Sequence, residues 1–255
     1  MKSRRGWRHR VAPVTLCDLR TPLLGASWEE NGTILFGARG GIWHVSDEGG
    51  ELELLIELGD NAYGLTPRML PGGEAFVFGK FTAETGRVSL RACRFSSGET
   101  VELSANGFDA SYLPTGHLIF AAENTLMAAP FDPYGLTLLA EPLPIVEDVA
   151  AVLLGNQLGN FSGISQYAVS ATGTLVHLSA GALTIYRTTV VSVGPEGTSL
   201  PQGEPRWQSD LRLSPSGERV ALHVRDDDDD IWVYDLGRGA MTRLTFEPGE
   251  DETPV

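Results

Sequence analysis

A short pattern anchored on glycine recurs five times along this chain and constrains its fold more than any other feature. Each copy has an apolar residue, three turn-forming residues, a glycine and an apolar, strand-like run, as in "LRLSPSGERVALHV" at residues 211–224. The anchoring glycines, spaced by 41, 43, 57 and 44 residues, are Gly32, Gly73, Gly116, Gly173 and Gly217. A repeat of this length indicates an array of small, similar supersecondary units.

Each unit continues with a second apolar run, a second glycine turn and a third, shorter run, as in "DIWVYDLGRG" followed by "MTRLTF" at residues 230–246. Glycine adopts the positive φ that tight turns require, and the chain holds 30 glycines and 15 prolines. Four short strands in about 40–45 residues are typical of a propeller blade. The sequence therefore predicts an all-β fold, a β-propeller of four-stranded antiparallel blades.

The repeat also predicts the domain organisation. We expect residues 1–10 to form a disordered basic tail and residues 11–255 to form a single propeller domain. The expected blade units span about residues 21–60, 61–105, 106–150, 161–205 and 206–250.

The first and last units carry a recognisable blade motif, "GASWEENGTILFGARGGIWHVSDEGGELELLIEL" (25–58) and "LRLSPSGERVALHVRDDDDDIWVYDLGRGAMTRLTF" (211–246). These stretches resemble blades of the TolB-like, WD-repeat-like β-propeller family, and the resemblance extends over nearly the whole chain from about Leu16. The middle unit, "FDASYLPTGHLIFAAENTLMAAPFDPYG" (108–135), is similar to propellers appended to bacterial serine/threonine protein kinases.

The resemblance implies a non-catalytic propeller used for binding or sensing, often as one module of a larger protein. It also implies a ring of six blades, of which this sequence holds five complete units, so both ends look truncated. The expected location is cytoplasmic if Met1 is the native start, and extracytoplasmic if the chain is the distal part of a membrane-bound kinase.

Charge and composition exclude several classes of protein. The formal net charge is −14 although residues 1–10 carry five positive charges, so the body of the chain repels nucleic acid. No run of 18 apolar residues is present, and we expect no membrane insertion by this chain. Cys17 and Cys93 are far apart, outside any C-x-x-C pattern, and are expected to act as small buried hydrophobic residues.

Motifs for catalysis are missing from the sequence. It contains no G-x-S-x-G, no H-E-x-x-H, no phosphate-binding glycine loop and no kinase signature, so any kinase activity would lie outside this chain. The strand histidines do not occupy equivalent positions of the repeat. We therefore expect that this chain is not an enzyme, holds no metal site and binds no cofactor.

The expected innermost strands alternate between apolar and polar residues in the positions just before each anchoring glycine. Alternate residues of a strand point to opposite faces, and the first strand of each propeller blade lines the axial channel. The polar set is therefore expected to approach the channel from different blades: Thr66, Arg68, Asp109, Ser111, Gln166, Asp210 and Arg212. These side chains could bind a small polar ligand or a peptide end, or they could form ion pairs in a water-filled channel.

The function predicted from these patterns is a binding or sensor module for a protein partner or a small polar ligand, part of a kinase-linked or TolB-like system and fused to or paired with other domains. The alternative is a propeller hydrolase or lyase acting on a small polar substrate in the channel.

Two further expectations concern single stretches. The acidic run Asp226–Asp230 occupies the expected loop between two strands, where a solvated turn competes with a cation site. Trp28, Trp43 and Trp232 lie at equivalent strand positions and are expected to pack between blades.

Overall fold

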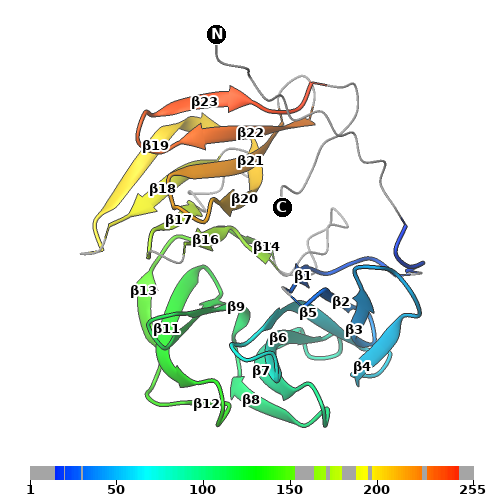
Figure 1. The fold of residues 1–255 in the computed structure, drawn as a ribbon. Coiled ribbons are helices and arrows are strands. Elements are labelled where there is room, and N and C mark those ends of the chain that lie inside the picture. Colours follow the sequence, from blue (N-terminus) through cyan, green and yellow to red (C-terminus); the bar gives the residue numbers. More distant parts are fainter. Residues whose placement is uncertain are drawn as a thin grey trace.

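The computed structural model describes residues 15–19, 21–29, 31–152, 164–170, 173–179, 188–194, 197–225 and 229–246. These residues form antiparallel sheets arranged around a common centre, and they contain no helix (Figure 1). The all-β propeller fold expected from the repeat is thus confirmed. The basic stretch 1–10 lies outside the described residues.

Blades 1 and 2 are regular four-stranded sheets in which the strands follow chain order from the inside outward. Blade 1 consists of β1 (Ala26–Trp28), β2 (Thr33–Ala38), β3 (Gly41–Ser46) and β4 (Glu53–Glu57). Blade 2 consists of β5 (Ala62–Met69), β6 (Ala75–Thr82), β7 (Arg87–Arg94) and β8 (Thr100–Ser104).

Blade 3 departs from the expected four strands. It consists of β9 (Phe108–Leu113), β10 (His117–Ala122), β11 (Thr125–Asp132), β12 (Thr137–Leu138) and β13 (Leu143–Val146). Both β12 and β13 pair with β11. The chain stops pairing with β11 after Leu138, at the end of β12, and pairs with it again from Leu143, at the start of β13. The outer position is therefore shared by two short strands. A two-stranded ribbon follows, β14 (Ala151–Val152) with β15 (Ile164–Ser165).

Blades 4 and 5 return to the regular order of four strands. Blade 4 consists of β16 (Tyr167–Val169), β17 (Leu175–Leu178), β18 (Thr188–Val193) and β19 (Ser199–Arg206). Blade 5 consists of β20 (Gln208–Leu213), β21 (Arg219–Arg225), β22 (Asp229–Asp235) and β23 (Ala240–Arg243).

The core lies between the sheets, in four clusters of buried apolar side chains that each join two consecutive blades. Between blades 1 and 2, for example, Leu35 and Ile42 pack with Phe76, Phe78 and Cys93. Burial raises the pKa of the Cys93 thiol to about 11, so it stays protonated at neutral pH and behaves as an apolar residue.

The tryptophan expectation is wrong for Trp28. It lies on the innermost strand β1, whereas Trp43 and Trp232 lie on the third strands β3 and β22, and it is 69% exposed. The equivalent residues of the other blades pack in the cluster shared with the preceding blade; they are Met69, Tyr112, Val169 and Leu213. Within the part of the chain that the structure describes, no sheet precedes blade 1. Trp28 therefore lacks the surface on which its counterparts are buried.

Glycines allow the backbones of blades 1 and 2 to approach closely. A Cβ added to Gly37 of β2 would lie 2.3 Å from the carbonyl oxygen of Gly64 in β5. A Cβ added to Gly64 would lie 2.5 Å from the carbonyl oxygen of Gly41. Backbone atoms cannot move aside as a flexible side chain can, so these positions accept only glycine.

Substitution at this contact should destabilise the propeller. Gly37→Ala forces the two sheets apart, and we expect it to lower the free energy of unfolding by about 1–3 kcal/mol, as overpacking does. Gly237→Ala is the control, because its added Cβ would meet no atom closer than 3.6 Å. Urea denaturation measures both variants, and equal stabilities of the two would contradict the proposed packing.

Candidate functional site

The innermost strands of three blades contain the same irregularity, a bulge in which two residues face one on the next strand. The register shifts between Leu65 and Arg68 in blade 2, with equivalent shifts in blades 3 and 5. The first bulge residue has a positive φ in each case, at 38° for Thr66, 48° for Asp109 and 52° for Asp210. A positive φ is strained for any residue but glycine, and such strain clusters at functional sites. The equivalent residue of blade 1 is Gly25, with a φ of 95°.

The bulge residues also link neighbouring blades. The Thr66 amide donates to the carbonyl oxygen of Leu24 at 2.9 Å, joining blade 2 to the segment before blade 1. The Asp210 amide donates to Oε1 of Gln166 at 2.7 Å, joining blade 5 to the segment before blade 4. These bonds fix the inner strands relative to one another across blade boundaries.

Asp109 makes the largest number of these links. Its Oδ2 accepts a hydrogen bond from the Ser165 amide at 2.8 Å, and its carbonyl oxygen accepts one from the Tyr167 hydroxyl at 2.6 Å. The same hydroxyl lies 3.3 Å from Oγ of Ser111. The Asp109 residue is only 3% exposed.

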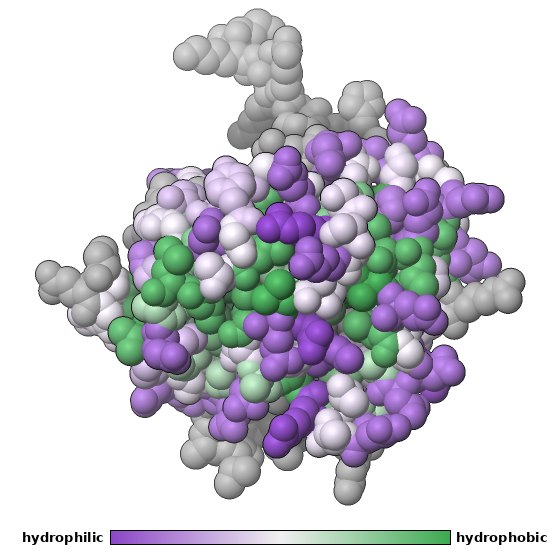
Figure 2. All heavy atoms as spheres, turned by 90° about the horizontal axis from the view of Figure 1, so that it is seen from below, coloured by the Kyte–Doolittle hydropathy of each residue, from purple (hydrophilic) through white to green (hydrophobic). Residues whose placement is uncertain are grey.

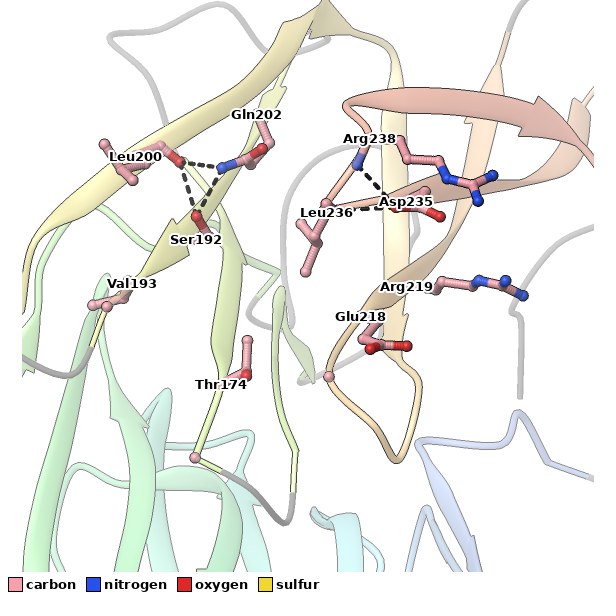
Figure 3. A pocket seen from close by; sticks show the side chains of 14 residues that line it. Thr174, Ser192, Val193, Leu200, Gln202, Glu218, Arg219, Asp235, Leu236 and Arg238 are labelled. Carbon is pink, nitrogen blue, oxygen red and sulfur yellow. Dashed lines mark hydrogen bonds between the residues drawn. The ribbon is translucent and has the colours of Figure 1, made fainter.

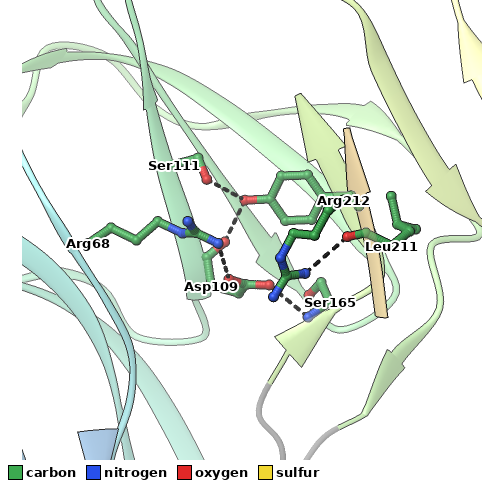
Figure 4. A network of polar contacts seen from close by, with 7 residues as sticks. Arg68, Asp109, Ser111, Ser165, Leu211 and Arg212 are labelled. Atoms are coloured by element: carbon green, nitrogen blue, oxygen red, sulfur yellow. Dashed lines mark hydrogen bonds and ion pairs between the residues drawn. The ribbon is translucent and has the colours of Figure 1, made fainter. Parts of the chain in front are cut away.

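Two arginines, one from blade 2 and one from blade 5, flank this carboxylate (Figure 4). Nη2 of Arg68, from blade 2, lies 3.9 Å from Oδ1 of Asp109. Arg212, from blade 5, donates through Nη1 to the carbonyl oxygen of Leu211 at 3.0 Å. We call Arg68, Asp109, Ser111 and Arg212 the inner-strand cluster.

Burial dominates the electrostatics of the inner-strand cluster. Desolvation raises the pKa of Asp109, against the lowering effects of Arg68, the Ser165 amide and Arg212. Desolvation lowers the pKa of Arg212, and the nearby charge of Arg68 lowers it further, while Asp109 and Asp210 oppose this. The cluster therefore holds charges that are only partly compensated, which is typical of binding and catalytic sites.

The structure brings four of the seven residues expected at the channel into this cluster. The other three, Thr66, Gln166 and Asp210, take part in the links between blades. Thr66 and Gln166 are 6% exposed, so their side chains are buried instead of lining an open channel.

Sequence reasoning missed the residues that hold the cluster together. Tyr167 occupies a position of the repeat where the other units have apolar residues. Only its hydroxyl group could have indicated that it forms a hydrogen bond, here to the carbonyl oxygen of Asp109. Ser165 contributes a backbone amide, which leaves no trace in the sequence. Next to the cluster, Oγ of Ser209 donates to Oδ2 of Asp210 at 2.7 Å and lies 3.1 Å from Nδ1 of His223.

The acidic run proves to be partly a structural element. Asp229 and Asp230 belong to β22, and residues 226–228 lie outside the described part of the chain. Asp230 is 2% exposed, pairs with Nη2 of Arg243 at 2.6 Å and accepts a hydrogen bond from Thr245 at 3.0 Å. The expectation of a solvated loop is therefore wrong for Asp230, because its charge is neutralised inside blade 5.

An open groove of about 720 Å³ lies elsewhere, between blades 4 and 5 (Figure 3). Its walls include Ser192 and Gln202 on one side and Asp235 and Arg238 on the other. Oδ1 of Asp235 accepts hydrogen bonds from the amides of Gly237 and Arg238, so this carboxylate closes a turn. None of the seven expected site residues lines the groove.

Exposed apolar side chains gather on the outer rim of blade 3. Figure 2 shows the side of the molecule below β8 and β12, where apolar patches alternate with polar side chains. The exposed apolar side chains of the outer part of blade 3 are Tyr134, Leu139, Leu143 and Ile145. An apolar rim of this kind can serve as a contact surface for another protein.

The described residues contain neither a metal-binding group nor a membrane-spanning helix. They contain no group of three or more histidines, cysteines or acidic residues that could hold a metal ion. They also form no helix of the length and apolarity that crossing a membrane requires.

Comparisons with known proteins establish the class of fold. No family model matches the sequence, and no curated protein matches it at a significant level. Among solved structures, TolB from Acinetobacter baumannii matches with a TM-score of 0.66 and 17% identity over 92% of this chain and 57% of that one. A putative TolB from Agrobacterium tumefaciens matches with a TM-score of 0.63 and 13% identity, over 90% and 83% of the two chains.

The fold is thus that of a TolB-like β-propeller, as the blade motif predicted. An oligogalacturonate lyase in complex with manganese also matches, with a TM-score of 0.59 and 12% identity over 86% of this chain and 63% of that one. At these identities the similarity defines the fold alone. Since the matched structures include TolB proteins and a lyase, the fold does not decide between a binding module and an enzyme.

The pKa of Asp109 predicts how its charge affects stability. Its folded-state pKa lies above the unfolded value of about 3.9, so ionisation is harder in the folded protein. The stability that this group contributes is complete below the unfolded pKa and is lost as the pH rises through the folded pKa. Asp109→Asn removes this dependence while keeping an oxygen that can accept from the Ser165 amide.

We therefore expect the difference in unfolding free energy, wild type minus Asp109→Asn, to fall as the pH rises above about 4. Urea denaturation across a pH series measures it. A difference that grows with pH would mean that the two arginines outweigh desolvation, contrary to this account.

Proposed function

We propose that this chain is a non-catalytic binding module that takes a small polar ligand at the inner-strand cluster. The observation that carries the proposal is that Arg68, Asp109 and Arg212, from three different blades, lie together, while the described residues leave most of the guanidinium donors unused. A strained backbone that presents charged side chains on packed strands is typical of a preorganised site.

The accessibility of the side chains supports binding at this place. The Arg68 side chain is 44% exposed, Ser111 and Arg212 are half-buried, and Asp109 is buried beneath them. A ligand arriving from solvent would meet the arginines first and the carboxylate last.

The way the polar groups are used favours binding over turnover. Oδ2 of Asp109 accepts from the Ser165 amide, so this oxygen is engaged in holding blade 4 and is not free to exchange a proton with a substrate. The hydroxyl of Ser111 lies 3.3 Å from that of Tyr167. Next to the cluster, the Ser209 hydroxyl lies near His223 but donates to Asp210, so its proton is not directed at the histidine as it is in an activated nucleophile.

We propose further that the propeller works with other domains or proteins, in a kinase-linked or TolB-like system. The blade motif supports this association, and the exposed apolar rim of blade 3 supports a contact with a protein partner. The intact mass of the natively expressed polypeptide, with its flanking reading frame, tests it. An upstream kinase domain in the same product is the expected result, and a native product with neither a further domain nor a copurifying partner would contradict it.

Ligand binding can be tested without knowing the ligand. A library of sugars, amino acids, organic acids and nucleosides is screened by thermal shift, and each compound that raises the Tm is titrated by calorimetry. We expect Arg212→Gln to weaken binding at least tenfold, or about 1.4 kcal/mol. Arg238→Gln, an exposed arginine of the same blade outside the cluster, is the matched control and should bind as the wild type does.

Two results would contradict the proposal. Equal binding by wild type and Arg212→Gln would place the ligand elsewhere. Conversion of the bound compound, followed by NMR of the mixture, would show the hydrolase or lyase activity instead.

A further inference from the structure

We infer that the ligand of the inner-strand cluster carries a carboxylate, which binds between the guanidinium groups of Arg68 and Arg212. This inference rests on the proposed function and adds the chemical class of the ligand. It is carried by three features of the cluster: unused hydrogen-bond donors, repulsion between the two arginines, and the placement of the neighbouring acids.

Among the residues that the structure describes, the two guanidinium groups have few hydrogen-bond partners, so most of their donors are unused. The contact from Arg68 to Asp109 is 3.9 Å, which is too long for a hydrogen bond. Arg212 uses one nitrogen on the Leu211 carbonyl oxygen, and no described side chain accepts a hydrogen bond from it. Each guanidinium has five N–H groups in a planar fork that matches the two oxygens of a carboxylate.

The arginines also repel each other. Arg68 disfavours the charged form of Arg212, in addition to the cost of burying it. Among the described acidic residues, Asp109 alone forms an ion pair with one of these arginines, and that arginine is Arg68. An anion placed between the guanidinium groups would offset both the repulsion and the desolvation, and it would make charge-assisted hydrogen bonds to both.

The protein's own acids cannot take this place. Asp109 is tied through Oδ2 to the Ser165 amide, and Asp210 is tied through Oδ2 to the Ser209 hydroxyl. Both carboxylates stay beside the arginines, where they limit how much further negative charge the cluster can accept.

This limit favours a carboxylate over a phosphate group. Asp109 and Asp210 already balance the two arginines in formal charge, and the whole chain carries −14. A phosphate monoester brings up to two negative charges at neutral pH, so these acids would repel it more strongly than they repel a singly charged carboxylate. The charge balance therefore favours a singly charged group over a doubly charged one.

Matched pairs of acids and amides test the inference on the full chain. Lactate, succinate and N-acetylglycine, each with its primary amide, and inorganic phosphate are titrated by calorimetry at low ionic strength. We expect at least one acid to bind at least tenfold more tightly than its amide and more tightly than phosphate. Arg68→Gln and Arg212→Gln should each remove this preference, and Arg238→Gln should keep it.

A second measurement uses the wild-type protein and does not depend on the folding of a variant. Phenylglyoxal modifies exposed arginines, and peptide mass spectrometry reports the extent at each one. The bound acid should protect Arg68 and Arg212, and its amide should not. Arg238 should react equally in all samples.

The outcomes separate this inference from the function on which it rests. Binding of phosphate or of an amide as tight as that of the acid, with loss in Arg212→Gln, would overturn the carboxylate and keep the binding site. Acid binding that persists in both glutamine variants would overturn the inference and the assignment of the site. Absence of binding by every probe would overturn the inference, while the wider compound screen decides on the proposed function.

Discussion

The positive φ of the first residue in each inner-strand bulge is the backbone constraint on which the arrangement of the inner-strand cluster depends. Beside each bulge, a backbone amide or carboxylate bonds to the neighbouring blade, as between Asp210 and Gln166. The bulge also shifts the register of the strand, and the residues two positions later are gathered near Asp109 (Figure 4). Arg68, Ser111 and Arg212 occupy this later position in their blades.

Asp109 combines a structural and an electrostatic role at this centre. Its backbone carbonyl and Oδ2 bind the segment that begins blade 4, and its Oδ1 faces the arginine of blade 2. A buried carboxylate of this kind is costly to desolvate, and the Ser165 amide together with the charges of Arg68 and Arg212 offsets part of that cost. The same residue therefore links blade 3 to the start of blade 4 and contributes a negative charge to the cluster.

The division of the chain into four-stranded blades could be predicted from the sequence, because glycine turns and apolar runs recur at regular intervals along it. The alternation before each anchoring glycine also identified the polar residues of the inner strands. The bulges could not be predicted, because threonine and aspartate at a positive φ give no local signal. The link from the Ser165 amide depends on the tertiary fold alone. The burial of Asp230 within an acidic run follows from its pairing with Arg243, which no local pattern indicates.

The central claim is that Arg68 and Arg212, from blades 2 and 5, face each other across the inner-strand cluster. A double-mutant cycle of Arg68→Gln and Arg212→Gln, on the free energy of unfolding without ligand, tests it most directly. If the two charges repel, each single variant relieves the same repulsion, and the double variant relieves it only once. The account predicts a double variant that is less stable than the sum of the single effects by about 0.5 kcal/mol or more. Strict additivity would contradict it, since it would mean that the two arginines do not interact.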